Sequence, residues 1–297
     1  MRKIFLLSIL FSITINSFSS RDDTIQMFNI FAVKDIAVLN KTFKTKFIRT
    51  VSIYEFNSKS FNYLVNTLRK NKTKFHNFKI TSDRLGSKYK KLLEFNIRKL
   101  TVNSISVGQV VVYPKWISDF KISKMELILS EGDDISRINF AEMIDLTSLK
   151  VKGVSMEEKV INRFSKIKYL DEFFLDLDST YNYKNLLDSL SYIKTLGINL
   201  NQTSLVNLQH HNCLQFLTVY DAKFSFITQI DKLCFIKNLK INTSLDVNQV
   251  KEFIKIQKCN PFISFFQNGY SINKWVAKRK MPKPKRKYVK PKRKSRR

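Results

Sequence analysis

A single apolar pattern recurs along the chain at a nearly constant spacing. It is a hexapeptide with apolar residues at its first, fourth and sixth positions, and it occurs nine times among the 297 residues. Its middle apolar residues are Val51, Phe78, Leu100, Met125, Leu149, Phe173, Leu196, Leu217 and Leu239, which are spaced 21 to 27 positions apart. A unit of this kind cannot bury its apolar face alone, but stacked copies can. The sequence therefore predicts an elongated stack of repeats.

The hexapeptide, written LxxLxL with other apolar residues allowed, resembles the leucine-rich repeat family, whose repeats run 20–29 residues. The resemblance covers about residues 48–245. It implies an α/β fold, a solenoid with a parallel sheet on its concave side and short helices on its convex side. The family's asparagine, five positions after the middle residue, is kept only as Asn201, so the repeats are degenerate. Frequent Lys, Asn, Ile and Phe, with a basic tail, resemble the secreted leucine-rich repeat proteins of microsporidian parasites.

Large aromatic residues occupy outward positions of several predicted strands. Because side chains alternate between the two faces of a strand, the neighbours of each middle residue point away from the core. Most of these neighbours are polar, but four are aromatic: Tyr54, Phe174, Phe216 and Tyr220. Exposed aromatic residues commonly anchor protein interfaces, so we expect these four to contact a protein ligand on the concave face. The alternative is that they pack on one another or under a loop.

The segments between the hexapeptides have the spacing of short helices. We expect such helices within 181–193, 204–213 and 227–236, and a longer helix over 246–258 with Asp246 as a possible N-cap. The predicted organisation has caps at 20–46 and 246–277 that flank repeats at 47–245. Solenoids need such caps to shield their end coils from water.

The chain begins with two basic residues, an apolar run from Ile4 to Ile15 and small polar residues, which is the form of a secretory signal peptide. We expect residues 1–19 to be removed and the protein to be extracellular. The alternatives are an N-terminal core element and a signal anchor. No later segment approaches the ~18 apolar residues of a membrane-spanning helix, so no membrane span is predicted.

Residues 278–297 form a tail with thirteen Lys or Arg and no acid, in a chain of net charge +29. Its prolines disfavour a helix, so we expect a disordered, extended segment. The tail resembles the heparin-binding consensus, which implies a sulfated polysaccharide as partner. The competing interpretations are a nuclear localisation signal at "PKPKRK", contact with nucleic acid, and a tail without a specific partner. The predicted polyanion-binding residues are Lys278, Arg279, Lys280, Lys283, Lys285, Arg286, Lys287, Lys290, Lys292, Arg293, Lys294, Arg296 and Arg297.

A second concentration of charge lies in residues 41–100, which have sixteen Lys or Arg against three acids. The stretch 101–277 is almost neutral, with twenty basic and eighteen acidic residues. Charge gathered in this way attracts polyanions with a strong dependence on salt.

Motifs for catalysis, metal binding or cofactor binding are lacking in the sequence, so the chain is expected to be no enzyme and to need no cofactor. An unrecognised enzyme would need a polar pocket with carboxylates. Asp133 and Asp134 are expected to form a solvated turn rather than a metal site. Cys213 and Cys234 are expected either to be buried thiols or to form a disulfide between adjacent repeats. The predicted function is a secreted protein-binding protein tethered by its tail, and the alternative is a secreted effector imported into a host nucleus.

Overall fold

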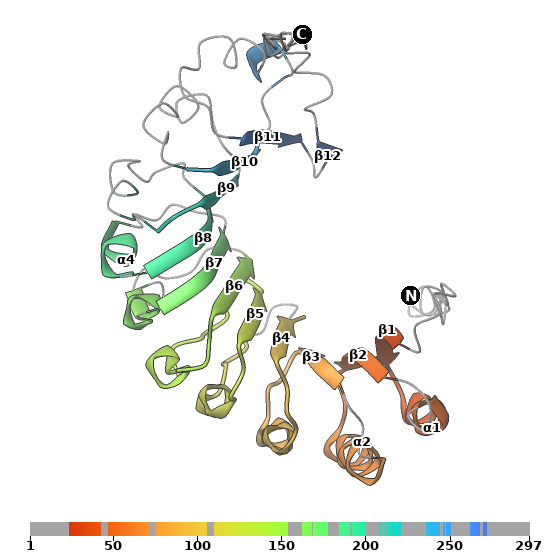
Figure 1. Cartoon of the computed structure of the whole chain (residues 1–297). Coiled ribbons are helices and arrows are strands. Elements are labelled where there is room, and N and C mark those ends of the chain that lie inside the picture. The colour runs from red at the N-terminus through yellow and green to blue at the C-terminus, as the bar shows by residue number, and fades with distance from the viewer. Residues whose placement is uncertain are drawn as a thin grey trace, which may run out of the picture.

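The computed structural model covers the whole chain and describes residues 24–42, 47–71, 75–105, 110–153, 162–167, 169–177, 184–190, 192–199, 208, 211, 213–220, 236–243, 246, 248–250, 262–267 and 270–271. These residues form one curved solenoid (Figure 1). The strands line the inner, concave side of the arc, and the helices lie along its outer, convex side. The fold is a solenoid of stacked repeats, as the spacing of the hexapeptides predicted, with the concave parallel sheet and convex helices that the resemblance to leucine-rich repeats implied.

Twelve strands form one sheet in which the spatial order follows the order along the chain. Strands β1 to β11 are parallel, whereas β12 is antiparallel to β11. The strands are β1 (Thr24–Ile30), β2 (Phe47–Tyr54), β3 (Phe75–Ser82), β4 (Lys99–Ser104), β5 (Lys124–Leu129), β6 (Ser148–Gly153), β7 (Tyr169–Leu177), β8 (Tyr192–Asn199), β9 (Phe216–Tyr220), β10 (Asn238–Asn242), β11 (Phe262–Gln267) and β12 (Tyr270–Ser271).

The nine predicted middle residues pair directly from strand to strand, so they form one continuous row across the sheet. The apolar residues at all three positions of the nine hexapeptides are buried, and none is more than 5% exposed. Each strand therefore buries one face against the convex elements, because a side chain and its second neighbour share a face. This row is the centre of the hydrophobic core.

The row extends by one strand at each end, through Phe28 of β1 and Ile263 of β11. The segments 20–46 and 246–277, expected to act only as caps, thus each add a parallel strand to the same sheet. Pairing in this way satisfies backbone groups that a covering segment would leave unpaired. At the C-terminal end, β12 turns back along β11 and takes the edge position.

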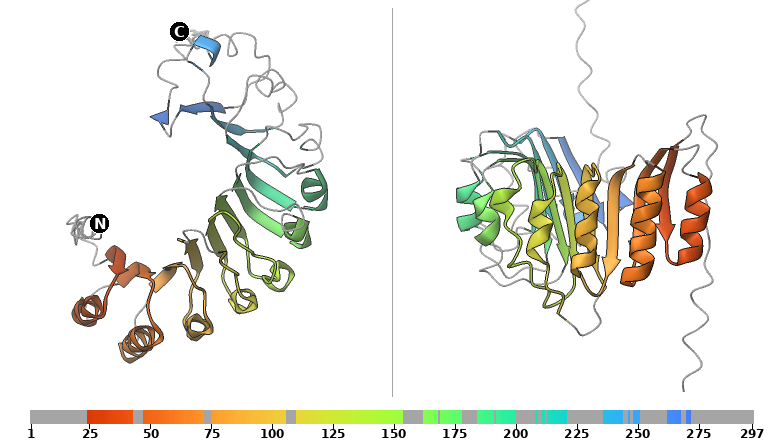
Figure 2. Two further views of the ribbon diagram at one scale, coloured as in Figure 1. Left: turned by 180° about the vertical axis from the view of Figure 1, so that it is seen from behind. Right: turned by 90° about the horizontal axis from the view of Figure 1, so that it is seen from below.

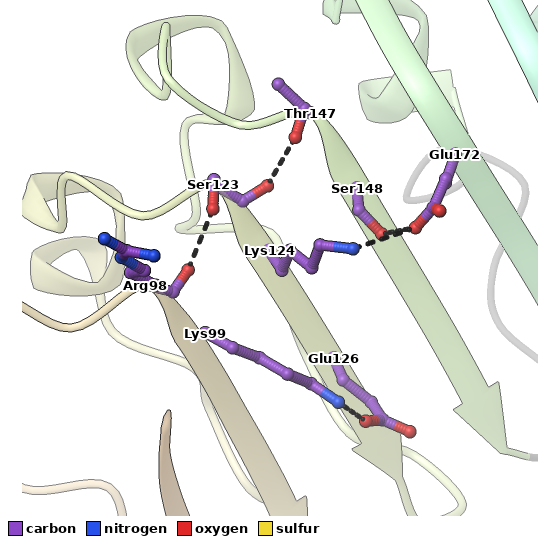
Figure 3. Close-up of polar contacts among 8 residues, drawn as sticks. All are labelled: Arg98, Lys99, Ser123, Lys124, Glu126, Thr147, Ser148 and Glu172. Carbon is purple, nitrogen blue, oxygen red and sulfur yellow. Dashed lines mark hydrogen bonds and ion pairs between the residues drawn. The ribbon is translucent and has the colours of Figure 1, made fainter. Parts of the chain in front are cut away.

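Backbone hydrogen bonds also connect the repeats at the start of each strand. The carbonyl of Arg98 accepts the backbone N–H groups of Ser123 and Lys124, and the same geometry repeats in the following coils. Hydroxyl groups add to this ladder: Ser123 Oγ donates to the Arg98 carbonyl at 3.3 Å, and Thr147 Oγ1 donates to the Ser123 carbonyl at 3.1 Å (Figure 3). These hydrogen bonds align the first residues of neighbouring strands, in agreement with the register of the sheet.

The helices on the convex side differ in length from repeat to repeat. They are α1 (Val33–Thr42), α2 (Ser58–Lys70), α4 (Lys184–Ser189) and the 3₁₀ helices η1 (Ser87–Glu94), η2 (Lys115–Asp119), η3 (Phe140–Glu142) and η4 (Asn162–Lys166). The 13-residue α2 lies in the longest repeat, between Val51 and Phe78, and the shorter repeats have room only for shorter or tighter helices. The helix expected within 181–193 is confirmed by α4, whereas 227–236, apart from Ile236, and most of 204–213 lie outside the described residues.

Asp246 caps a helical turn, as predicted. Its Oδ1 accepts the backbone N–H groups of Asn248 at 2.7 Å and Gln249 at 3.0 Å. Gln249 Oε1 in turn accepts the Asp246 N–H at 3.2 Å, which completes a reciprocal capping arrangement. The remainder of the expected helix, the leader 1–19 and the tail 278–297 lie outside the described residues.

Candidate functional site

The concave face is built from the residues that flank each buried middle residue. Its central strands, β4 to β7, carry mostly charged side chains. Its C-terminal strands, β8 to β11, carry mostly aromatic and uncharged polar side chains, together with Lys240. The predicted alternation therefore produces a surface with two chemically different parts.

The four predicted aromatic residues divide into two groups. Tyr54 lies at the N-terminal end of the arc, where its ring stacks on Phe31 with centroids 4.4 Å apart and planes inclined by 17°. Phe174, Phe216 and Tyr220 lie together on β7 and β9. The structure thus places three of the four near one another and leaves Tyr54 stacked on a separate partner.

Phe174 and Tyr220 meet over a glycine on the strand between them. Gly197 of β8 pairs with Phe174 on one side, and a Cβ at Gly197 would overlap the Phe174 ring and lie 3.0 Å from the Tyr220 hydroxyl oxygen. Only a residue without a side chain leaves this space free for the two rings. Atoms of both side chains therefore lie close to Gly197.

Phe216 has a different environment, because it forms one wall of an open groove on the concave face. The groove has a volume of about 420 Å³, and we call it the aromatic groove. Apart from the buried Leu217 and Leu239, it is lined by Thr195, Phe216, Thr218, Asn238, Lys240, Ser264 and Phe266. Phe216 is 37% exposed, so its ring is accessible to a ligand.

Lys240 supplies the charge in the aromatic groove. Its Nζ lies 4.3 Å from the centroid of the Phe266 ring, within the range of a cation–π contact. Among the residues that the structure describes, none of those that line the groove is acidic. The groove therefore offers two aromatic rings, hydroxyl and amide groups, and one positive charge, which suits an apolar group that also carries a hydrogen-bond acceptor or a carboxylate.

The central strands carry ion pairs that cross from strand to strand. Lys99 Nζ lies 2.6 Å from Glu126 Oε2, and Lys124 Nζ lies 3.5 Å from Glu172 Oε2 (Figure 3). Ser148 Oγ also donates to Glu172 at 2.7 Å from the strand between them. These contacts hold the charged side chains in fixed positions beside the aromatic part of the face.

Burial and neighbouring charges change the pKa values on this face. Burial raises the pKa of Glu126, but the hydrogen bond and the charge of Lys99 outweigh burial and leave it below its usual value. Burial and the charge of Lys152 lower the pKa of Lys150. Burial, with a smaller effect of Asp176, raises the pKa of Tyr220, so its hydroxyl stays protonated and can donate a hydrogen bond.

The other residues singled out in the sequence have structural positions. Asp133 accepts the N–H groups of Val111 and Ser130, and Asp134 accepts that of Ser136, so the pair forms a turn as expected. Cys213 is an exposed free thiol, not a buried one, because it sits in a surface turn before β9, whereas Cys234 lies outside the described residues. Within the described ranges, no three His, Cys, Asp or Glu side chains converge on a possible metal position.

No helix in the described part of the chain has the length and apolar character needed to cross a bilayer.

The second ring of the aromatic groove and its charged residue were not predicted as site residues from the sequence. Phe266 belongs to β11, which was expected to be part of a cap, and Lys240 is one of the polar neighbours of a middle residue. The repeat spacing could have predicted the outward position of Phe266, because Phe266 follows Ile263 by three positions, as Tyr220 follows Leu217. An extension of the repeat register into 246–277 finds it.

No protein-family model matches the sequence, and no curated protein is similar to it. Among solved structures, the chain is similar to an internalin from Listeria monocytogenes, with 12% sequence identity, a TM-score of 0.41 and 82% of each chain covered. A similarity this low says nothing about ligands or partners. The assignment of the fold depends instead on the parallel sheet of this chain and its convex helices, which form a leucine-rich repeat solenoid.

Proposed function

We propose that the chain is an exported, non-enzymatic leucine-rich repeat protein that binds a protein ligand on its concave face. Its basic tail tethers it to a sulfated glycosaminoglycan or a similar polyanion at a cell surface. The aromatic groove is the observation that carries the first part of this proposal, and the charge of residues 278–297 carries the second.

The composition of the aromatic groove favours binding over catalysis. Aromatic side chains, Phe among them, are enriched at protein interfaces, and the positive charge of Lys240 can pair with a carboxylate of the ligand. The groove volume lies within the ~300–1,000 Å³ typical of pockets that receive one compact chemical group. We infer that an apolar side chain of the ligand enters between Phe216 and Phe266, while the fixed ion pairs of β4 to β7 select its charged surroundings.

The groove is tested by a matched pair of variants, Phe216→Asp and Tyr169→Asp. Both residues are exposed aromatics on neighbouring parts of the sheet, but Tyr169 lies outside the groove. Full-length protein is applied to cells treated with heparinase, so that the contribution of the tail is removed. Phe216→Asp should lower cell binding by about tenfold or more, whereas Tyr169→Asp should not. Equal binding of the two variants would exclude the groove.

The tail is tested on a heparin column eluted with a salt gradient. A full-length variant with the basic residues of 278–297 replaced by Gln should elute at much lower salt than the natural chain, because each ionic contact releases counterions when it forms. Elution of the variant and the natural chain at the same salt concentration would show that the tail does not contribute to heparin binding.

A second candidate function is a secreted effector that enters a host nucleus through "PKPKRK" at 282–287. The same tail supports it, and an origin in a microsporidian-like parasite would supply the host. Localisation of the tagged full-length protein in host cells separates the two. Retention at the surface fits the tether, and nuclear accumulation that is lost in the Gln variant fits the effector.

A further inference from the structure

The convex side of the first coils carries a concentration of exposed basic side chains that is separate from the tail. Helices α2, η1 and η2 belong to consecutive coils and contact one another in that order. Figure 2 shows the helices of these coils side by side along the outer side of the arc. The exposed basic residues of the three helices are Lys59, Arg69, Lys70, Lys90, Lys91 and Lys115, which we call the convex basic patch.

The packing of α2 explains why its basic residues point outward. Phe61, Leu64, Val65 and Leu68 follow the i, i+3, i+4, i+7 spacing and are buried against the sheet. Thr67 is buried with them, and Lys59, Tyr63, Asn66, Arg69 and Lys70 are exposed. Lys59 in the first turn and Lys70 at the last position therefore stand at the two ends of one exposed surface, about 16 Å apart along the axis.

Polar contacts join this surface to the next coils. Lys91 Nζ of η1 donates to Asn62 Oδ1 of α2 at 2.8 Å, and Arg69 of α2 donates to Glu94 of η1 at 2.6 Å. Lys90 of η1 lies 3.9 Å from Asp119 of η2. The patch is thus one continuous surface over three coils.

The charge balance of the patch is strongly positive. Two acids, Glu94 and Asp119, take part in its ion pairs, against six basic residues. Within the described part of the chain, Lys59, Lys70 and Lys115 form no ion pair. Among the described residues, the next convex elements along the arc carry fewer basic side chains: η3 has Glu142 and no Lys or Arg, and η4 has Arg163 and Lys166.

We propose that the convex basic patch is a second polyanion site, which binds a sulfated polysaccharide independently of the tail. This inference rests on the proposed export of the protein, because export determines which polyanion it meets. A linear sulfated chain can follow the row of lysines across α2, η1 and η2. Helix α2 lies on the convex side of the arc, whereas strands β9 to β11 line its concave side (Figure 1). The polysaccharide and a protein ligand can therefore be bound at the same time.

The experiment uses full-length protein in which the basic residues of 278–297 are replaced by Gln, and a heparin oligosaccharide of defined length as the probe. One variant replaces Lys59, Lys70 and Lys115 with Gln. The matched control replaces Lys166, Lys194 and Lys237, three exposed lysines outside the patch. Affinity is measured by calorimetry at several salt concentrations. Circular dichroism checks that both variants remain folded, as expected for substitutions of exposed side chains.

The patch variant should bind about tenfold more weakly or worse, and its slope of log affinity against log salt should fall by about 2 to 3. The control should lose much less. Absence of heparin binding in the tail-neutralised chain would overturn the patch and leave the tail proposal standing. Equal losses in the two variants would also overturn the patch. Tighter binding of duplex DNA than of heparin at the same salt concentration would overturn the assignment to a sulfated polysaccharide.

Discussion

Substitution of Gly197 by Ala tests the arrangement of aromatic rings on the concave face. The new Cβ would lie 3.0 Å from Phe174 Cε1 and 3.0 Å from the Tyr220 hydroxyl oxygen, and closer still to Phe174 Cδ1. Ordinary carbon–carbon contacts are about 3.5–4.0 Å. The Phe174 ring must therefore shift by roughly 1 Å or rotate away, and overpacking of this kind costs about 1–3 kcal/mol. Because Ala is favoured over Gly in a strand by about 0.5–1 kcal/mol, the net loss should be about 0.5–2 kcal/mol.

A double-mutant cycle separates the overlap from the backbone effect. Urea unfolding is measured for Gly197→Ala, Phe174→Ala and the double variant. Removal of the Phe174 ring frees the space for the new methyl group, so the Gly197→Ala loss should disappear or become a gain in the double variant. We expect a coupling free energy of about 1 kcal/mol or more. Additive effects would show that Phe174 does not lie over Gly197, and would refute the packing described for this part of the face.

Three further perturbations test the core, the backbone and the ion pairs. Leu100→Ala removes a fully buried side chain from the central row and should cost about 2–5 kcal/mol in urea unfolding; a smaller loss would contradict its burial. Gly153→Ala places a side chain at φ 146°, against the Leu129 backbone, and should cost about 2 kcal/mol or more, whereas Gly86→Ala, with no atom within 4 Å, should stay within about 1 kcal/mol of the natural chain. Lys99→Met removes the contact that keeps the pKa of Glu126 low. A carboxyl pKa that is lower in the folded state stabilises the fold at pH values above the unfolded-state pKa, and this stabilisation is lost as pH falls through the folded-state pKa. The variant's loss in free energy of unfolding should therefore be large at neutral pH and smaller in acid. A deficit that does not change with pH would show that Glu126 does not depend on Lys99.

The core and the order of the strands were predictable because they depend on a simple period. Each hexapeptide places its apolar residues on one face, and a shift by one residue would expose all of them. The register of Val51, Phe78 and Leu100 therefore follows from the sequence alone.

The limits of the repeat region were harder to predict. Residues 25–30 fit the hexapeptide, with Phe28 in the middle position, but their place beside the leader suggested a cap. Before β11, the sequence has Asn260 at the first position of the hexapeptide, so the apolar pattern around Ile263 is incomplete although Ile263 pairs in register with Leu239. At the ends of a solenoid, a strand has only one neighbouring coil to pack against, and its pattern is less constrained.

The aromatic groove depends on more than the period. The alternation of side chains identified Phe216, but the second ring that lines the groove, Phe266, comes from a strand that was not predicted. The difference between Phe216, which lines the groove, and Phe174, which covers Gly197, depends on a single small residue in the strand between β7 and β9. Side-chain size across neighbouring strands decides which aromatic residues remain accessible.

Distances between spin labels across the sheet test the stacking of the strands most directly. With the native cysteines replaced by Ser, one label is fixed at Asn238 of β10, and the second is placed in turn at Asn77, Lys99 and Lys124, which occupy equivalent positions on β3, β4 and β5. Neighbouring strands lie about 4.7–4.9 Å apart, so each move to the next strand should shorten the distance by about 5 Å or slightly less on this curved face. Distances that do not fall in this order, or that stay constant, would contradict the in-register solenoid.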